Sequence, residues 1–192
     1  AHERFPGTGK VRYWYSFGIN QSFYESSGYD VSAAWRTDLG FMPGALRMNL
    51  LWTHRDTHTF QTTEDSDPFD FVGEVGYNDD KVKFTIAWES EHWMVSLDNT
   101  WYSDSLDDVS QTKNDYHLNQ LGDIFYMDAQ VRFFPNEDWQ FYVGVDNLTD
   151  QDPPYCPSCN NEPSPGSHYS GGQYRPWSSM FFYGGIKYTF GR

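Results

Sequence analysis

Two cysteines, Cys156 and Cys159, stand in a Cys-Pro-Ser-Cys segment and are the only ones among the 192 residues. A redox Cys-x-x-Cys opens a helix after a strand, and structural zinc needs two more ligands close by. The stretch at 152–172, which is rich in Pro, Gly and Asn, shows neither feature. We therefore expect a disulfide, which would indicate an oxidising compartment outside the cytoplasm. Two free thiols and a metal site are the alternatives.

Carboxylates are concentrated in residues 62–80, without a single Lys or Arg among them. They are Glu64, Asp65, Asp67, Asp70, Glu74, Asp79 and Asp80. Carboxylate oxygens at this density can hold Ca²⁺, although their spacing does not match an EF-hand loop. We expect a solvated acidic loop near lipopolysaccharide with loosely bound calcium at most, and otherwise no metal or cofactor. Paired acids such as Asp107 and Asp108 have no nucleophile or base nearby, so we expect no enzyme.

A third group with chemical potential lies between residues 150 and 178 and combines aromatic rings with one cation. Its members are Tyr155, His168, Tyr169, Tyr174, Arg175 and Trp177. Rings of this kind bind sugars and flat chelates by stacking, so these six residues are the candidate ligand-binding set. The alternative is that they belong to an aromatic girdle or pack the loop against itself.

Composition limits the classes of protein that could carry these groups. With 13 Lys and Arg against 27 Asp and Glu the formal charge is −14, which makes nucleic acid an unsuitable partner. Aromatic residues make up 19% of a chain that is only 38% hydrophobic, so many of them must lie on surfaces. No run of 18 apolar residues exists, which excludes a transmembrane helix but not a membrane β-barrel.

Apolar residues recur with period two, which predicts β-strands with one apolar face. The predicted strands cover residues 29–36, 46–55, 82–89, 93–101, 125–133, 139–146 and 182–190. Each runs about ten residues, the length of a tilted membrane-spanning strand. Trp and Tyr stand near the strand ends of the apolar face, as in the aromatic girdles of membrane barrels.

The predicted connections alternate between short and long. Residues 38–44, 90–92 and 135–138 form short turns, whereas residues 62–80, 103–120 and 150–178 form long loops. Short periplasmic turns and long external loops are typical of outer-membrane barrels. The fold class predicted is therefore all-β, a transmembrane antiparallel β-barrel.

Seven strands cannot complete such a barrel, because bacterial single-chain barrels have an even number of strands. We expect residues 1–16 to be an external loop segment and residues 17–192 to be the C-terminal part of the barrel, with earlier strands supplied by upstream sequence. The opposite, polar face should line the lumen and contact a plug, its charges satisfying one another. These residues are Asp30, Arg36, Arg47, Arg55, Lys83, Glu89, Asp98, Asp128, Arg132 and Asp146.

Three segments resemble TonB-dependent receptors, which are 22-stranded outer-membrane transporters with a plugged lumen. Residues 144–155, Gly-Val-Asp-Asn-Leu-Thr-Asp-Gln-Asp-Pro-Pro-Tyr, are similar to the family's G-x-x-N-L-F-D-x-x-P-P stretch, with Thr149 in place of the usual Phe. Residues 20–30 resemble its N-x-x-x-x-x-x-x-G-h-E/D strand, where h is apolar. Residues 183–190 resemble its closing strand, although Gly191 and Arg192 follow the aromatic that usually ends the chain.

The resemblance implies the last seven of 22 strands and energised uptake of a large, scarce solute: a ferric siderophore, a cobalamin or an oligosaccharide. It also implies an outer-membrane location in a Gram-negative bacterium, and a plug domain that contacts the periplasmic TonB coupling protein. Lipid and lipopolysaccharide would be the other partners. A general porin and a soluble all-β carbohydrate-binding module are the alternative functions.

Overall fold

The computed structural model describes residues 2–5, 7–8, 10–14, 22–111, 119–157, 174 and 179–190, and these form an all-β chain. Strand content follows from the period-two pattern, because alternating side chains suit a sheet with two different faces. In the part of the chain that is described, no helix is long and apolar enough to span a membrane.

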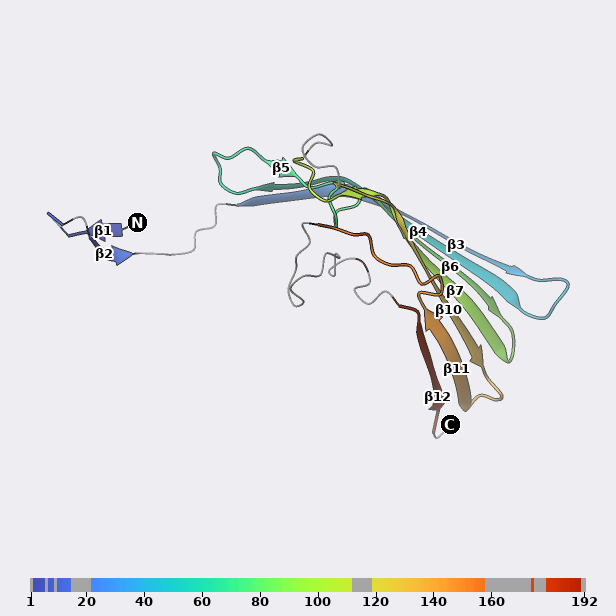
Figure 1. Cartoon of the computed structure of the whole chain (residues 1–192). Helices are drawn as coiled ribbons and strands as arrows, with labels where there is room; N and C mark the ends of the chain where they lie inside the picture. Colours follow the sequence, from blue (N-terminus) through green and yellow to red (C-terminus); the bar gives the residue numbers. More distant parts are fainter. Residues whose placement is uncertain are drawn as a thin grey trace.

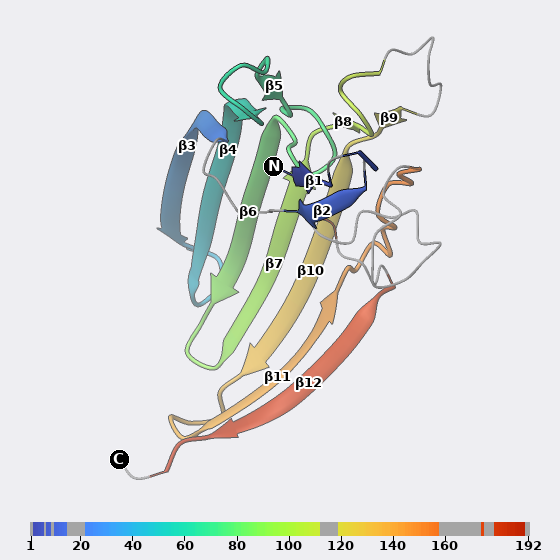
Figure 2. The ribbon, with the colours of Figure 1, turned by 90° about the vertical axis from the view of Figure 1, so that its left-hand side faces the viewer.

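One open antiparallel sheet dominates the fold (Figure 2). Its seven main strands are β3 (Phe23–Asp38), β4 (Ala45–Gln61), β6 (Asp80–Glu89), β7 (Trp93–Tyr102), β10 (Ile124–Phe133), β11 (Trp139–Asp146) and β12 (Phe181–Tyr188). They pair in chain order, so each strand lies beside the one that precedes it, and β3 and β12 form the two edges. The seven strands predicted from the alternation are thus confirmed, in a sheet that is not closed.

Five short strands complete the described elements. The short strand β5 (Phe69–Asp70) pairs with the upper part of β4, while β8 (Ser105–Leu106) pairs with β9 (Gln120–Leu121). At the N-terminus, β1 (His2–Arg4) and β2 (Val11–Trp14) form a separate antiparallel hairpin, within the segment expected to be a loop. The alternation did not indicate these strands because each is too short to show a period.

The connections alternate in length as expected. Residues 39–44, 90–92 and 134–138 join strands at one end of the sheet, called here the short-turn end. The remaining connections, over residues 62–79, 103–123 and 147–180, join strands at the opposite, long-loop end, and their described parts contain β5, β8 and β9.

The sheet bends, and residues 147–157 lie on the inner side of the bend (Figure 1). The long loops also share a small core: Leu121 and Cys156 pack with Val75, and Tyr174 packs with Ile124 and Tyr126. Because Ile124 and Tyr126 belong to the polar face of β10, that face is the concave one, and the apolar face is convex. We call the described residues of the three long connections the loop cap; they are residues 62–79, 103–111, 119–123 and 147–157 together with Tyr174.

Candidate functional site

The convex face carries apolar side chains in rows that run straight across the strands. Trp35, Met48, Ile86, Leu97, Ala129, Val145 and Phe182 form one such row, as the strand registers show. Many of these side chains have no cover: Val143 is 63% exposed, Ile186 65% and Phe182 71%. Soluble monomers rarely expose an apolar surface of this extent, and such surfaces are typical of sites that contact another protein or a membrane.

Tryptophans stand at both ends of this face. Near the long-loop end, Trp52 and Trp101 are in register with Val82, and near the short-turn end Trp88 and Trp93 lie on neighbouring strands. Eight residues separate Trp93 from Trp101 along β7, a distance of about 26 Å before any strand tilt. The lipid-facing band of outer-membrane barrels is about 25 Å tall and has aromatic girdles at both interfaces.

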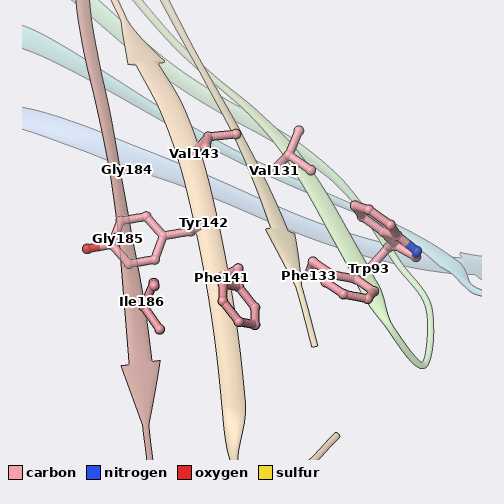
Figure 3. A pocket seen from close by; sticks show the side chains of 9 residues that line it. All are labelled: Trp93, Val131, Phe133, Phe141, Tyr142, Val143, Gly184, Gly185 and Ile186. Carbon is pink, nitrogen blue, oxygen red and sulfur yellow. The ribbon is translucent and has the colours of Figure 1, made fainter. Parts of the chain in front are cut away.

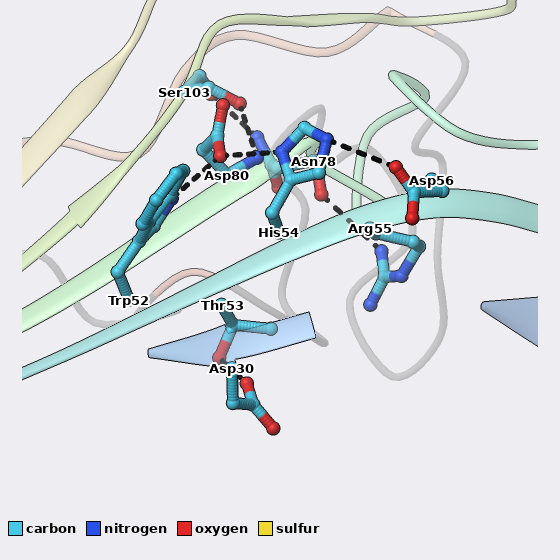
Figure 4. Close-up of polar contacts among 9 residues, drawn as sticks. All are labelled: Asp30, Trp52, Thr53, His54, Arg55, Asp56, Asn78, Asp80 and Ser103. Atoms are coloured by element: carbon cyan, nitrogen blue, oxygen red, sulfur yellow. Dashed lines mark hydrogen bonds and ion pairs between the residues drawn. The ribbon is translucent and has the colours of Figure 1, made fainter. Parts of the chain in front are cut away.

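The indole N–H groups nearest the long-loop end are held by carboxylates. Trp52 donates to Asp80 at 2.7 Å, and Nδ1 of His54 lies 2.8 Å from the same Asp80 oxygen (Figure 4). Farther along the sheet, Trp101 donates to Asp123 at 2.9 Å. Apolar surface therefore gives way to charged groups at these tryptophans, as expected at a boundary between an apolar and an aqueous environment.

A shallow hollow interrupts the convex face beside the β12 edge. It lies among Trp93, Val131, Phe141, Val143 and Ile186 (Figure 3). Gly184 leaves the space, because it stands in the apolar row beside Val143 without a side chain. Its lining is mostly apolar and suits another apolar surface.

The concave face has the opposite character. The registers and the alternation along each strand place all ten residues predicted to face the lumen on this one surface: Asp30, Arg36, Arg47, Arg55, Lys83, Glu89, Asp98, Asp128, Arg132 and Asp146. Figure 4 shows Asp30 and Thr53 on the side of β4 away from Asp80, where Thr53 donates to Asp30 at 2.5 Å.

The expectation that these ten charges satisfy one another and contact a plug stays a prediction. Among the described residues one ion pair joins two of the ten, Arg47 to Glu89 at 2.8 Å. Carboxylates instead accept from uncharged donors: Asp98 from Thr85 at 2.7 Å, and Asp128 from the backbone of Asn147 at 2.8 Å. The register explains this, because it sets Thr53 beside Asp30 and Thr85 beside Asp98, and places Asp98 opposite Asp128 rather than opposite a cation.

The candidate ligand-binding set falls only partly within the described residues. Tyr155 is 53% exposed. Tyr174 is 2% exposed: its hydroxyl lies 3.0 Å from Nδ2 of Asn78, and its ring meets Tyr102 edge-on. Tyr174 therefore packs the loop cap, which was the alternative for this set. His168, Tyr169, Arg175 and Trp177 lie outside the described residues.

An aromatic cluster that the sequence did not indicate lies at the long-loop end. His58 stacks on Tyr77 at a centroid distance of 4.3 Å, Tyr24 meets His58 edge-on and forms a short hydrogen bond with it, and Phe71 packs on Tyr77. The guanidinium of Arg55 lies 5.6 Å from the centre of the Tyr77 ring. The outermost ring, that of Tyr24, is 58% exposed and offers a flat face for stacking.

A β-bulge creates this cluster. Gly28 opposes Arg55 while Ser27 opposes Thr57, so Asp56 is an extra residue in β4. Beyond this extra residue, the even-numbered residues of β4 face the concave side instead of the odd-numbered ones. His58 and Phe60 therefore lie on the concave side, on the same face as Tyr24. A Cβ at Gly28 would collide with the backbone oxygen of His54, so this glycine is needed where the two strands approach.

The described carboxylates of the long loops form hydrogen bonds within those loops. No group of three or more His, Cys, Asp or Glu side chains within the described residues could hold an ion. Burial raises the pKa of Glu74, whereas hydrogen bonds from Ser110 lower the pKa of Asp108. These carboxylates organise the loop cap: Glu74 accepts from the backbone of Val109 at 3.4 Å, and Asp108 accepts from Ser110 at 2.8 Å.

Cys156 is fully buried in the loop cap, with its sulfur 2.8 Å from a carboxylate oxygen of Asp107. Cys159 lies outside the described residues. The disulfide between the two therefore stays a prediction.

The turn that follows β11 lies within residues 144–155, one of the segments that resemble the receptor family, and Asn147 holds it together. Asn147 has a φ of 55° and is 1% exposed, and its side-chain amide exchanges hydrogen bonds with the backbone of Gln151 at 2.9 and 3.1 Å. Asn tolerates this left-handed conformation better than most residues. Asp150 then accepts from the backbone of Met180 at 3.0 Å, which ties the two ends of the last loop together.

Comparisons with protein-family models, with curated proteins and with solved structures find no match to this chain.

Proposed function

We propose that this chain is part of the wall of an outer-membrane β-barrel, and that the barrel is a TonB-dependent receptor. The observation that carries the proposal is the division of the sheet into an exposed apolar convex face and a polar concave face. A soluble sandwich would bury its apolar face against a second sheet. Among the described residues no such layer covers the convex face. A lipid environment accounts for this arrangement.

The open edges of the sheet support the same conclusion. Both β3 and β12 leave a row of backbone N–H and C=O groups without a strand partner within the described residues. Each such group costs several kcal/mol in lipid, so a membrane sheet must close. In our proposal the remaining strands close the barrel and a plug occupies its lumen.

The receptor assignment is narrower and rests on the three sequence segments that resemble the family, at residues 20–30, 144–155 and 183–190. The second segment contains Asn147, whose buried amide holds the turn at the start of the last long loop. This contact is a structural reason for an Asn at that position of the segment. In this proposal a ferric siderophore, a cobalamin or an oligosaccharide enters at the long-loop end. The TonB coupling protein energises its passage, and no covalent chemistry occurs.

Cell fractionation tests whether the protein is an outer-membrane barrel, and uptake assays test whether it is a TonB-dependent receptor. We expect the complete polypeptide that carries this chain, produced in a Gram-negative host, to be found in the outer membrane and to migrate differently on gels before and after boiling. Recovery in solution without detergent would instead support a carbohydrate-binding module. Uptake of ferric siderophores, cobalamin and oligosaccharides should stop when the coupling protein is deleted. Uptake that continues unchanged would support a passive porin.

A further inference from the structure

A row of three aromatic rings crosses the long-loop end of the sheet on its concave side. Tyr24 of β3 is the register partner of Phe60 of β4, and Phe60 is the register partner of Phe69 of β5. Register partners of an antiparallel pair point to the same face, so the three rings stand side by side across neighbouring strands. Adjacent strands lie about 4.8 Å apart, so the row extends about 10 Å. We call these three residues the aromatic strip.

The aromatic strip is exposed at both ends and is one ring deep. Tyr24 is 58% exposed and Phe69 37%, whereas Phe60 between them is half-buried. In the next row of β4, His58 is only 8% exposed, and Tyr77 stacks on it. The hydroxyl of Tyr24 forms a hydrogen bond with the His58 ring, which fixes the orientation of the Tyr24 ring. The sheet therefore presents a narrow line of oriented rings.

The loops around the aromatic strip are acidic. Glu64, Asp65 and Asp67 are exposed on the connection that joins β4 to β5. The described residues of the three long connections contain no Lys or Arg, whereas Asp or Glu occurs in each of them. Arg55, which lies farther from the loops along β4, has its guanidinium 5.6 Å from the centre of the Tyr77 ring. An anionic ligand is therefore repelled as it approaches the strip, while the carboxylates can accept hydrogen bonds from hydroxyl groups.

We propose that the aromatic strip binds the sugar rings of an uncharged oligosaccharide. The faces of a sugar ring carry C–H groups that stack on aromatic rings, and its rim carries hydroxyls that donate to carboxylates. A linear chain of sugar rings matches a line of aromatic rings in shape, whereas cobalamin presents one plate that is wider than a strip one ring deep. A ferric siderophore with a net negative charge is repelled by the acidic loops. The inference rests on the proposed function and selects the oligosaccharide among its three solutes.

Two neighbouring aromatic residues allow a matched test. Phe23 and Tyr24 lie on opposite faces of β3 and are exposed to a similar degree, 53% and 58%. The complete polypeptide is purified in a detergent without a sugar head group and applied to an array of neutral oligosaccharides that includes maltohexaose and cellohexaose. The Kd of the strongest binder is then measured by isothermal titration calorimetry. We expect at least one neutral chain to bind, with a Kd that does not change between low and high salt because the ligand carries no charge.

Ring variants then test the aromatic strip itself. Tyr24→Ala should weaken binding of that oligosaccharide about fivefold to tenfold, the effect of losing one stacked ring. Phe69→Ala, on a different strand, should act in the same direction, and Tyr24→Phe, which keeps the ring face, should retain most of the affinity. Phe23→Ala should leave the Kd unchanged. Absence of binding to the neutral chains, preference for a ferric siderophore or an acidic glycan, or equal losses in Tyr24→Ala and Phe23→Ala would overturn the inference. Tyr24-dependent sugar binding by a protein recovered in solution without detergent would keep the sugar site and overturn the proposed function.

Discussion

The convex and concave faces are built by the same seven strands and differ only by a shift of one residue along each strand, yet they have opposite chemistry. On β6, Phe84 and Ile86 point to the convex side while Lys83 and Thr85 point to the concave side. The concave face is partly covered by the loop cap and carries hydrogen bonds, whereas large apolar side chains remain exposed on the convex face. Under the proposed function the two faces meet different surroundings, lipid on the convex side and a polar lumen on the concave side.

The largest effect should come from placing a charge on the convex face. Leu50 lies in the middle of the apolar rows, in register with Phe84, and its neighbour Asn49 faces the concave side. Leu50→Arg should lower the free energy of unfolding by about 2–4 kcal/mol, the cost of Arg near the centre of a bilayer. Denaturant titration in lipid vesicles measures it. Asn49→Arg is the matched control and should cost little; equal losses at both positions would remove the distinction between the faces.

A smaller effect is expected at the turn that joins β11 to the loop cap. Asn147→Ala removes the amide that satisfies both backbone groups of Gln151 and leaves Ala at a φ of 55°. We expect a loss of about 2 kcal/mol in the free energy of unfolding, because buried groups lose partners and the backbone is strained. Asn147→Gly relieves the strain but not the lost bonds, so it should lie between Ala and the wild type. A wild-type melting curve for the Ala variant would show that the turn does not need this amide.

Changes at the cysteine pair should affect the loop cap and leave the sheet unaffected. A disulfide between Cys156 and Cys159 would close a very short ring, so it should contribute below about 2 kcal/mol in the chain-entropy account. Replacing both cysteines by Ser should weaken solute binding and leave barrel folding intact. Maleimide labelling of the denatured, unreduced protein is the direct check: incorporation at both positions would show two free thiols instead.

The smallest effect concerns pH and is confined to the loop cap. Burial raises the pKa of Glu74, so its ionised form is disfavoured in the folded cap. Cap stability should therefore fall as pH rises from the ordinary carboxyl range through the raised pKa. Glu74→Gln should remove this dependence, while the hydrogen bond to Val109 can persist. The measurement is the rate of protease cleavage within residues 103–111 against pH.

Asp108 serves as a control, because the stability that it contributes should change with pH in the direction opposite to that of Glu74. Hydrogen bonds from Ser110 lower the pKa of Asp108, so its contribution is present at neutral pH and is lost as pH falls through the lowered pKa. Asp108→Asn should weaken the cap at neutral pH and leave little difference in strong acid. If both variants shifted cleavage in the same direction, the two carboxylates would not act through their separate surroundings.

Much of the sheet could be predicted from the sequence, because each strand encodes its two faces locally. Val82 to Trp88 on β6 is sufficient to identify a strand and its apolar side, and the alternation of short turns and long loops fixes neighbours in a chain-ordered sheet. The same pattern could not reveal the bulge at Asp56. The extra residue changes which side chains of β4 face the concave side, but no particular residue type in the sequence marks its position. The cluster around His58 was missed for this reason.

Contacts between distant segments were also beyond the sequence pattern. Tyr174 meets Asn78 across 96 positions, so a residue expected to meet a solute is instead buried in the loop cap. The position of Arg36 opposite Arg47 could not be foreseen either, because the period of a strand gives the face of a charge but not the register of its neighbours.

The central claim is that the convex face contacts lipid, and spin-label accessibility along β6 tests it most directly. Single cysteines at Lys83, Phe84, Thr85 and Ile86 are labelled in the complete polypeptide, with Cys156 and Cys159 replaced by Ser, and reconstituted in vesicles. Collisions with oxygen should dominate at Phe84 and Ile86, and collisions with a water-soluble nickel complex should dominate at Lys83 and Thr85. Access of the nickel complex to Phe84 and Ile86 equal to its access to Lys83, without a period of two, would contradict the account.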